Sequence, residues 1–395
     1  MKLNFKDLSK KEKILLIIRF SVLFAVLLIW GLSASKKGDS NNNNNDNDEP
    51  NIVIDYETYN ISDTEIGLAS YTGGSKDELI IPEVIDGKNV VALGDNIFAG
   101  AEYEIASIII PKSVRLIGKK AFYNNLHITR VTFRSGSDLE TIEELAFSNT
   151  KNLTEFTIPS KVMDIREGAF RGSGITKFTI LDNPYYQWED NFLINTNVTD
   201  ENSSIAIYAY PETRDVVVPS SVKVLAAYLF ENNQNIDSID LNQVEYLGVG
   251  VFADSSVSSI TGENVKDIDM DALLNTPWLA NQTNEFVILG SVLIKYLGED
   301  SEVIVPEGII QIGHNSFSSS NIRLIVLPES ITSIGKNAFI NCEALESIEF
   351  NSTRPPLING DSFASKVKIY VPESYYNYYK NNVLFKNISN EIIAK

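Results

Sequence analysis

The chain has very few of the residues that usually carry nucleophilic, redox or metal chemistry. It contains one cysteine, Cys342, and two histidines among 395 residues. A single cysteine cannot form an intrachain disulfide, and it excludes a structural zinc site built from several cysteines. His127 and His314 stand at positions that predict generic solvent-facing side chains, so neither is expected to join a Ser-His-Asp or Cys-His arrangement. The fold is therefore expected to be held by packing alone.

Positive charge is also scarce, with 33 Lys and Arg against 52 Asp and Glu and a formal net charge of −19. This balance argues against nucleic acid or an anionic membrane surface as a partner, because both need clustered basic residues. Glu143-Glu144 and Asp267 to Asp271 are dense acidic groups, but both lack the glycine-punctuated loop of a calcium motif. Because phosphate-loop and zinc-protease motifs are missing too, we predict no catalytic, cofactor-binding or metal-binding residue, and no enzyme activity.

A long apolar run occurs at the N-terminus. Five lysines within residues 2–13 precede the stretch from Ile14 to Leu32, which ends in small residues. This order is typical of an export signal, so residues 1–35 are predicted to be a signal peptide or membrane anchor. Ser35 stands where a lipoprotein signal carries cysteine, which leaves three alternatives: cleavage by an ordinary peptidase, retention as an anchor, or replacement of a lipidated cysteine. The Asn- and Asp-rich residues 36–50 predict a flexible tether, and the remainder is expected outside the cytoplasm, at the cell surface or released.

The chain is rich in repetition. Phenylalanines recur in three runs, with neighbours 22 to 25 residues apart: Phe98, Phe122, Phe147 and Phe170, then Phe230 and Phe252, then Phe317, Phe339 and Phe363. Prolines that follow a branched aliphatic residue recur in the same phase: Pro82, Pro111, Pro159, Pro219, Pro306, Pro328 and Pro372. Because period and phase agree, the sequence predicts a tandem array.

One unit, Ile322 to Cys342, shows the pattern. Its β-branched run Ile325–Leu327 predicts a strand of three or four residues, which Pro328 ends because proline cannot donate to a strand ladder. Gly335 then permits either a bend with positive φ or a close backbone approach, and Ala338-Phe339 is expected to point inward. Cys342 is expected to be a small packing residue at a corner, where other units carry Asn125, Ser173 and Ser255.

Such units bury a continuous core only when they are stacked, which is the principle of a solenoid. The phrase strand-Pro-x-x-Val-x-x-Ile-Gly-x-x-Ala-Phe-x-x-Cys resembles the BspA-like, or Treponema-type, subfamily of leucine-rich repeats. The resemblance extends from Ile52 to Lys395. It implies an α/β or mainly β solenoid with short parallel strands, an N-terminal β-hairpin cap and a C-terminal strand-helix cap.

The resemblance and the spacing together suggest a domain plan. Residues 51–77 are expected to form the N-terminal hairpin cap, residues 78–366 the repeats, and residues 367–395 the C-terminal cap. Two stretches lengthen the repeat spacing and predict hairpin insertions near 193–213 and 276–299. Since both begin just past the corner of a repeat, we expect them to project from the same side of the array.

Two sets of residues are candidate contacts. The strand-centre residues are predicted to point away from the core along one sheet face: Ile109, Thr132, Thr157, Thr179, Val217, Asp240, Val326 and Glu349. Aromatic residues near the insertions are candidates for stacking on a sugar or anchoring a partner, although they could instead pack the insertions against the array: Tyr185, Tyr186, Trp188, Tyr208, Tyr210 and Trp278. A similar tyrosine cluster falls in the C-terminal cap.

The sequence therefore leads to a functional hypothesis and a rival. The BspA-like resemblance implies a bacterial cell-surface adhesion module, which we expect to be a monomer that binds a protein or extracellular-matrix partner through an extended repeat surface. The alternative is a surface protein that binds glycan through the aromatic residues of the insertions. A catalytic role has only scattered carboxylates in its favour.

Overall fold

The computed structural model describes residues 55–100, 104–196, 204–210, 214–359, 362, 366–386 and 390–395. The predicted export segment at 1–35 and the tether at 36–50 lie outside these residues, as does Phe363. Within the described part of the chain, no helix has the length and apolar character needed to cross a membrane.

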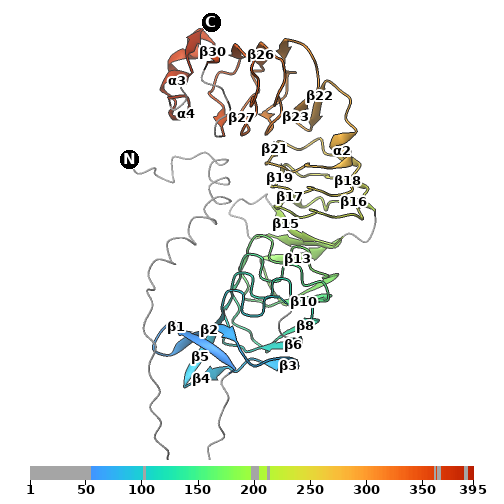
Figure 1. Ribbon diagram of the computed structural model, residues 1–395, viewed down its shortest axis with the longest axis vertical. Helices are drawn as coiled ribbons and strands as arrows, with labels where there is room; N and C mark the ends of the chain where they lie inside the picture. Colours follow the sequence, from blue (N-terminus) through green and yellow to red (C-terminus); the bar gives the residue numbers. More distant parts are fainter. Residues whose placement is uncertain are drawn as a thin grey trace, which may run out of the picture. The chain divides into compact units, whose positions relative to one another are not determined.

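The described residues from Asp55 onward form a parallel β-solenoid in which most turns contribute two short strands. The strands that precede the prolines form the first ladder, and Figure 1 shows β16 and β18 of this ladder on the opposite side of the array from β17 and β19. The first ladder consists of β3 (Lys76–Ile80), β6 (Ile105–Ile110), β8 (Arg130–Phe133), β10 (Glu155–Ile158), β12 (Lys177–Ile180), β16 (Asp215–Val217), β18 (Ser238–Asp240), β20 (Ser259–Thr261), β24 (Glu302–Ile304), β26 (Leu324–Leu327), β28 (Ser347–Phe350), β30 (Lys368–Val371) and β31 (Ile392–Ala394).

The second ladder follows the prolines, and its members are mostly two-residue strands. It consists of β2 (Glu65–Tyr71), β5 (Lys88–Leu93), β7 (Leu116–Ile117), β9 (Thr141–Ile142), β11 (Asp164–Ile165), β15 (Ser204–Ala209), β17 (Val222–Leu225), β19 (Tyr246–Leu247), β21 (Asp267–Ile268), β23 (Val292–Tyr296), β25 (Gln311–Ile312), β27 (Ser333–Ile334) and β29 (Leu357–Ile358). Strands of consecutive turns pair in parallel, as in Ile117 opposite Ile142. The predicted solenoid of short parallel strands is therefore confirmed.

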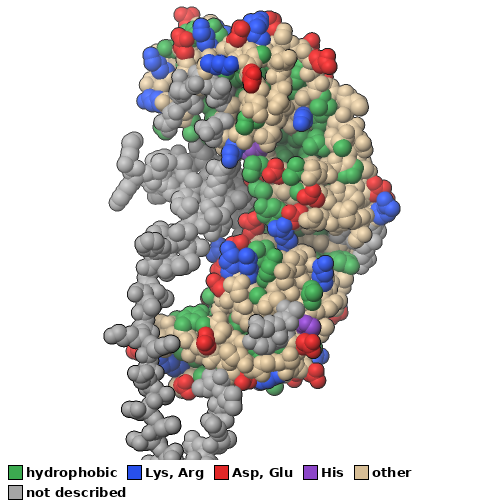
Figure 2. Space-filling model, viewed as in Figure 1, with side chains coloured by type: hydrophobic (Ala, Val, Ile, Leu, Met, Phe, Trp, Pro, Cys, Tyr) green, Lys and Arg blue, Asp and Glu red, His purple; other side chains and the backbone are tan. Residues whose placement is uncertain are grey.

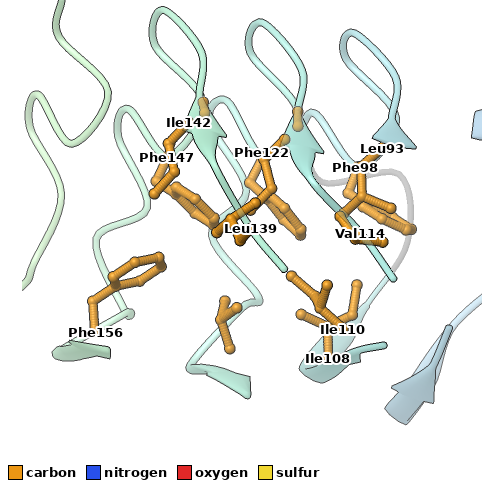
Figure 3. Close-up of a cluster of buried hydrophobic side chains, with 14 of the residues drawn as sticks. Leu93, Phe98, Ile108, Ile110, Val114, Phe122, Leu139, Ile142, Phe147 and Phe156 are labelled. Carbon is orange, nitrogen blue, oxygen red and sulfur yellow. The ribbon is translucent and has the colours of Figure 1, made fainter. Parts of the chain in front are cut away.

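The core lies between the two ladders, where the phenylalanines of successive turns stack (Figure 3). The ring centroids of Phe122 and Phe147 are 4.8 Å apart, and those of Phe98 and Phe122 are 5.2 Å apart. Each ring is buried, and burying one phenylalanine contributes about 1.5–3 kcal/mol. Strand residues such as Ile108 and Ile110 complete the same core from the first ladder.

Each Ala-Phe pair sits in a tight turn flanked by two left-handed residues. In the turn around Phe339 these are Asn337 and Asn341, with φ of 59° and 58°. Gly335 itself is not left-handed; a Cβ there would lie 2.6 Å from the backbone nitrogen of His314. Of the two explanations that the sequence allowed for this glycine, the close backbone approach is correct, and the positive φ falls two residues later.

The two insertions interrupt both ladders. The first contains β13 (Tyr186–Glu189), β14 (Phe192–Asn195) and β15, which form an antiparallel meander, and β15 then pairs in parallel with β17. The second contains α2 (Pro277–Ala280), β22 (Phe286–Leu289) and β23, and β23 pairs with β25. The expectation that both insertions project from the array was wrong, because each places its last strand in the second ladder.

The insertions also divide the core into three clusters. The first extends from Ile66 to Phe178 and also takes in Tyr186, Leu193 and Tyr208, the second extends from Phe192 to Val292, and the third from Leu293 to Phe385. Each insertion thus separates two stretches of regular stacking.

Additional elements lie at the two ends of the array. β1 (Tyr56–Asn60) pairs antiparallel with β2, and β4 (Val84–Ile85) pairs antiparallel with β5. After β30 the chain forms η3 (Glu373–Tyr375), α3 (Tyr376–Asn381) and α4 (Val383–Lys386) before β31. Tyr379 and Phe385 pack on Phe350, with ring centroids 5.8 Å away in both cases. β1 and the segment from η3 to β31 lie within 51–77 and 367–395, whereas β4 lies in the predicted repeat range, so the two caps stay a prediction.

Candidate binding surface

The strand-centre residues of the first ladder lie in register and face solvent. Strand alternation buries Ile108 and Ile110 and turns Ile109 outward. The predicted residues pair across neighbouring strands as Ile109 with Thr132, Thr157 with Thr179, Val217 with Asp240, and Val326 with Glu349, and all eight are exposed or half-buried. We call these strand-centre positions the outer row. The predicted residues therefore do line one outward face of the first ladder, and the role of this face in binding stays a prediction.

The outer row contains residues that the sequence interpretation missed. Ile80 pairs with Ile109, Ile304 pairs with Val326, and both have large exposed fractions, 52% and 73%. Val217 is exposed to 61%. A sequence signal was available, because Ile80, Val217 and Ile304 each stand two residues before a ladder proline. Each of the three lies on the first strand of a sheet in the first ladder, namely β3, β16 or β24.

A mainly polar row borders the outer row two residues earlier along most strands of the first ladder. Glu78 accepts a hydrogen bond of 3.2 Å from the Ser107 hydroxyl and lies 3.6 Å from the Arg130 guanidinium. Further along the array, the Ser238 hydroxyl donates to Asp215 at 2.6 Å. On the face drawn in Figure 2, Lys and Arg side chains are interspersed with Asp and Glu. A mainly uncharged row, with Asp240 and Glu349 as its acidic members, beside mutually paired charges suits a polypeptide partner better than a polyanion.

Three of the six aromatic candidates are not available to a ligand. Tyr186, Tyr208 and Trp278 are only 3%, 7% and 8% exposed. The Tyr208 hydroxyl donates to the Ile175 carbonyl at 2.8 Å, and burial raises its pKa to about 12. Burial likewise raises the pKa of Tyr186. Proposing these three as contacts was wrong, because the insertions use them as their own core.

The other three aromatic candidates form no shared platform. Tyr185 and Trp188 are half-buried and pack against the first core cluster, with the Trp188 ring 5.1 Å from Phe178. Tyr210 is exposed, beside a cavity at the first insertion. The tyrosine cluster near the C-terminus is split in the same way, with Tyr379 buried and Tyr378 exposed. The glycan hypothesis therefore loses most of its proposed stacking surface.

The structure corrects the placement of one histidine. The His314 side chain is only 12% exposed, and its Nδ1 accepts a hydrogen bond of 3.0 Å from the Lys336 backbone. Its Nε2 lies 3.7 Å from an Asp269 carboxylate oxygen, so it is not the generic surface imidazole that we expected. His127 is half-buried.

Three carboxylates of the two acidic groups are engaged within the fold. Glu144 pairs with Lys119 at 2.7 Å, Asp267 accepts from the Gln311 amide at 2.7 Å, and Asp269 accepts from the Tyr246 hydroxyl at 2.8 Å. Across the described ranges, no group of three or more Cys, His, Asp or Glu side chains is arranged to hold a metal ion.

Cys342 is buried, and its thiol contacts the Phe317 carbonyl at 3.0 Å. Asn125 donates to the Phe98 carbonyl at 2.9 Å from the corresponding corner of an earlier turn. The thiol therefore repeats a contact that an asparagine makes elsewhere, in agreement with the predicted packing role.

Solenoids whose turns pair short parallel strands around a core of stacked aliphatic and phenylalanine side chains include the leucine-rich repeat proteins. The chain matches the BspA type leucine rich repeat region in six copies, over residues 64–199, 190–280 and 295–393. It belongs to this family, as its sequence pattern suggested. A comparison with curated proteins finds no significant match.

The chain is similar to several solved structures. The pneumococcal vaccine antigen PcpA is 19% identical, with 86% of this chain and 96% of that chain covered and a TM-score of 0.42. A leucine-rich cell surface protein of Faecalibacterium prausnitzii is 20% identical over 79% of this chain and 96% of its own, with a TM-score of 0.27. The Treponema pallidum leucine-rich repeat protein is 22% identical over 51% of this chain and 86% of its own, with a TM-score of 0.32.

Proposed function

We propose that the protein is an exported, non-enzymatic binding module that holds a protein or matrix partner against the outer row at the cell surface. Family membership supports a repeat-based binding role. The predicted export segment supports the location. The observation that carries the proposal is the register of the outer row, which presents exposed β-branched side chains such as Val217 and Ile304 on strands of fixed spacing.

The physical basis is preorganisation. Parallel strands lie about 4.8 Å apart, so the outer row is a rigid series of side chains whose positions are set before a partner arrives. Little side-chain or loop freedom is then lost on binding, which lets many modest contacts add up. Aliphatic side chains at the centre with paired charges at the border match the arrangement of protein interfaces.

The test introduces positive charge into the outer row. In the triple variant Ile80→Lys, Val217→Lys and Ile304→Lys, the fold should be retained because all three side chains are exposed. Binding to a panel of immobilised extracellular matrix proteins should fall by about tenfold or more, since each lysine must be desolvated in the interface. The measurement is surface plasmon resonance.

Leu126→Lys with Met163→Lys is the control, because both residues are exposed apolar side chains outside the first ladder, and it adds two of the three positive charges. Equal loss in the control would contradict the proposal, as would unchanged binding in the triple variant. A glycan array read in parallel decides the alternative: binding that Tyr210→Ala abolishes and the triple variant spares would favour glycan.

A further inference from the structure

The second insertion leaves an open strand edge inside the first ladder. β20 ends one sheet of this ladder and β24 begins the next, and no backbone hydrogen bond among the described residues joins the two strands. β24 pairs in parallel with β26, with Glu302 opposite Leu324 and Ile304 opposite Val326. No strand of the described chain pairs with its other side.

The hydrogen bonds to β26 show which backbone groups lie on the open side. The Val305 N–H donates to the Val326 carbonyl at 3.0 Å. Because successive residues of a strand direct their backbone groups to opposite sides, Ile304 and Glu302 turn their N–H and C=O groups away from β26. Within the described residues these two donors and two acceptors have no hydrogen-bond partner. We call these four groups the β24 edge.

Side chains along the β24 edge are exposed. Ile304 has the largest exposed fraction of the large hydrophobic residues in the described chain, 73%, and Glu302 is exposed beside it. The first strand after the other insertion, β16, instead shares a cavity of about 460 Å³ with the hairpin turn at Asp190 and Asn191. Of the two breaks in the first ladder, the second insertion therefore leaves the more accessible edge.

The surroundings of the β24 edge are acidic. Residues 297–322 contain no Lys or Arg. Arg323 pairs with Glu302 and also lies 3.3 Å from Glu346. Among the described residues, no ion pair engages the other three carboxylates near the strand. The exposed carboxylates on or beside β24 are Glu299, Asp300, Glu302 and Glu307.

The backbone groups and the charge together identify the occupant. Unpaired N–H and C=O groups on an extended strand are complementary to another extended strand. A second copy of β24 would bring like charges together, so the carboxylates disfavour self-pairing and favour a basic segment. We propose that the β24 edge binds an extended segment of a protein partner that carries lysine or arginine, as an added strand. The inference rests on the proposed protein-binding function and deepens it, because the added strand extends the outer row.

The parallel register of the ladder specifies the segment. An added strand places one residue opposite Glu302 and another, two positions later, opposite Ile304, with both side chains on the outer face. A basic side chain suits the first position and an aliphatic side chain the second. The residue between them donates its N–H to the Glu302 carbonyl and accepts from the Ile304 N–H.

Hydrogen exchange tests whether the edge is open. In the free protein, the amides of Glu302 and Ile304 should exchange about a hundredfold faster than those of Val303 and Val305, which face β26. Equal protection of the four amides would show that the edge is covered and would overturn the proposal.

Peptide binding tests the occupant. The probe is the pentapeptide acetyl-Thr-Lys-Val-Val-Thr-amide, titrated to millimolar concentration and followed by the NMR amide signals of Glu302 and Ile304. Both signals should shift on binding. N-methylation of the central valine should weaken binding about tenfold or more, because its N–H faces β24. N-methylation of the following valine, whose N–H points away, is the matched control. Absence of binding, or equal loss with the two methylated peptides, would overturn the proposal.

A second peptide tests the charge preference. Acetyl-Thr-Glu-Val-Val-Thr-amide keeps the backbone and the valines and replaces the basic residue with an acidic one. It should bind at least about threefold more weakly than the lysine peptide, the size of effect that exposed charges produce. Equal binding of the two peptides would overturn the basic character assigned to the partner segment.

A matched pair of variants locates the binding. Glu302→Pro removes an edge N–H and places the proline ring on the edge, and it breaks no bond to β26 because that N–H faces away. It should weaken pentapeptide binding about tenfold or more. Glu302→Gln removes the same charge but keeps the N–H, and should bind within about threefold of the unmodified protein. Equal binding by the two variants would overturn the proposal, and the methylated peptides test it independently of how the proline variant folds.

Failure of this inference can be distinguished from failure of the proposed function. Ile80→Lys with Val217→Lys alters the outer row on β3 and β16 and leaves β24 unchanged. This double variant should lose the matrix partner and bind the pentapeptide normally. Retention of both ligands would contradict the proposed function and leave the β24 edge supported. Loss of the pentapeptide in the double variant would place the peptide elsewhere on the outer row and overturn the β24 edge.

Discussion

The Gln311 side chain forms a hydrogen bond to the backbone of Ile268 across the second insertion, although the two residues are 43 positions apart. Its Oε1 accepts from the Ile268 N–H at 2.8 Å, and its Nε2 donates to Asp267 at 2.7 Å. At the first insertion the Tyr186 hydroxyl accepts from the Ile165 N–H at 2.9 Å. In both places a side chain takes over a contact at the end of a sheet, where no further strand pairs.

Replacing Gln311 should therefore destabilise the protein. Gln311→Leu keeps a side chain of similar size but removes the acceptor for the buried Ile268 N–H and the donor to Asp267. We expect a loss of about 1–3 kcal/mol in the free energy of unfolding, the usual cost of leaving a buried polar group without its partner. Urea denaturation followed by circular dichroism measures the change.

Ser333→Ala is the matched control. Ser333 occupies the same strand position one turn later, and its buried hydroxyl has no hydrogen-bond partner within the described residues. The control should therefore change stability by no more than about 0.5 kcal/mol. If Ser333→Ala lost as much stability as Gln311→Leu, the loss would come from changing any residue at this strand position and not from breaking the hydrogen bond to Ile268.

Alkaline pH should weaken the protein through its buried tyrosines. Burial raises the pKa of Tyr208 to about 12, whereas an unfolded tyrosine ionises near 10. Between these values the folded state retains a proton that the unfolded state has lost, so stability is complete below about pH 10 and falls as the pH rises toward 12. Urea denaturation between pH 9 and 11.5 should show this fall, and Tyr208→Phe should make it shallower. An unchanged slope in the variant would assign the effect to other groups.

The periodic part of the molecule could be predicted because it depends on local rules. Strand alternation alone places Ile109 outward and Ile108 inward, and the constant spacing of Phe122 and Phe147 makes them stack. The proline two residues after the outer row marks the same position in most turns. These features repeat, so each turn supports the interpretation of the next.

The features at the insertions could not be predicted, because they arise from contacts between distant segments. Tyr208 looks like an available ring in the sequence, and only its contact with Ile175, 33 residues earlier, shows that it is core.

The left-handed positions give a third prediction. Asn337 has φ of 59°, and its counterpart in the preceding turn is Asn315 at 55°. Asn337→Ala should cost about 1 kcal/mol because an ordinary side chain crowds the backbone in this region, while Asn337→Gly should be nearly neutral. Thermal unfolding of the two variants measures the difference. If alanine and glycine were equally destabilising, the asparagine side chain and not the backbone conformation would be responsible.

The three core clusters should respond separately to damage. Phe147 is fully buried between Phe122 and Phe170, with centroids 4.8 Å and 5.7 Å away, so Phe147→Ala should cost about 3–5 kcal/mol within the first cluster. In a solenoid each turn contacts only its neighbours, so the added hydrogen exchange should be concentrated before the first insertion. Phe339→Ala, in the third cluster, should produce the opposite pattern, with faster exchange after the second insertion. Hydrogen exchange by mass spectrometry resolves the two outcomes. A uniform increase along the whole array in both variants would show that the insertions transmit stability between the clusters instead of separating them.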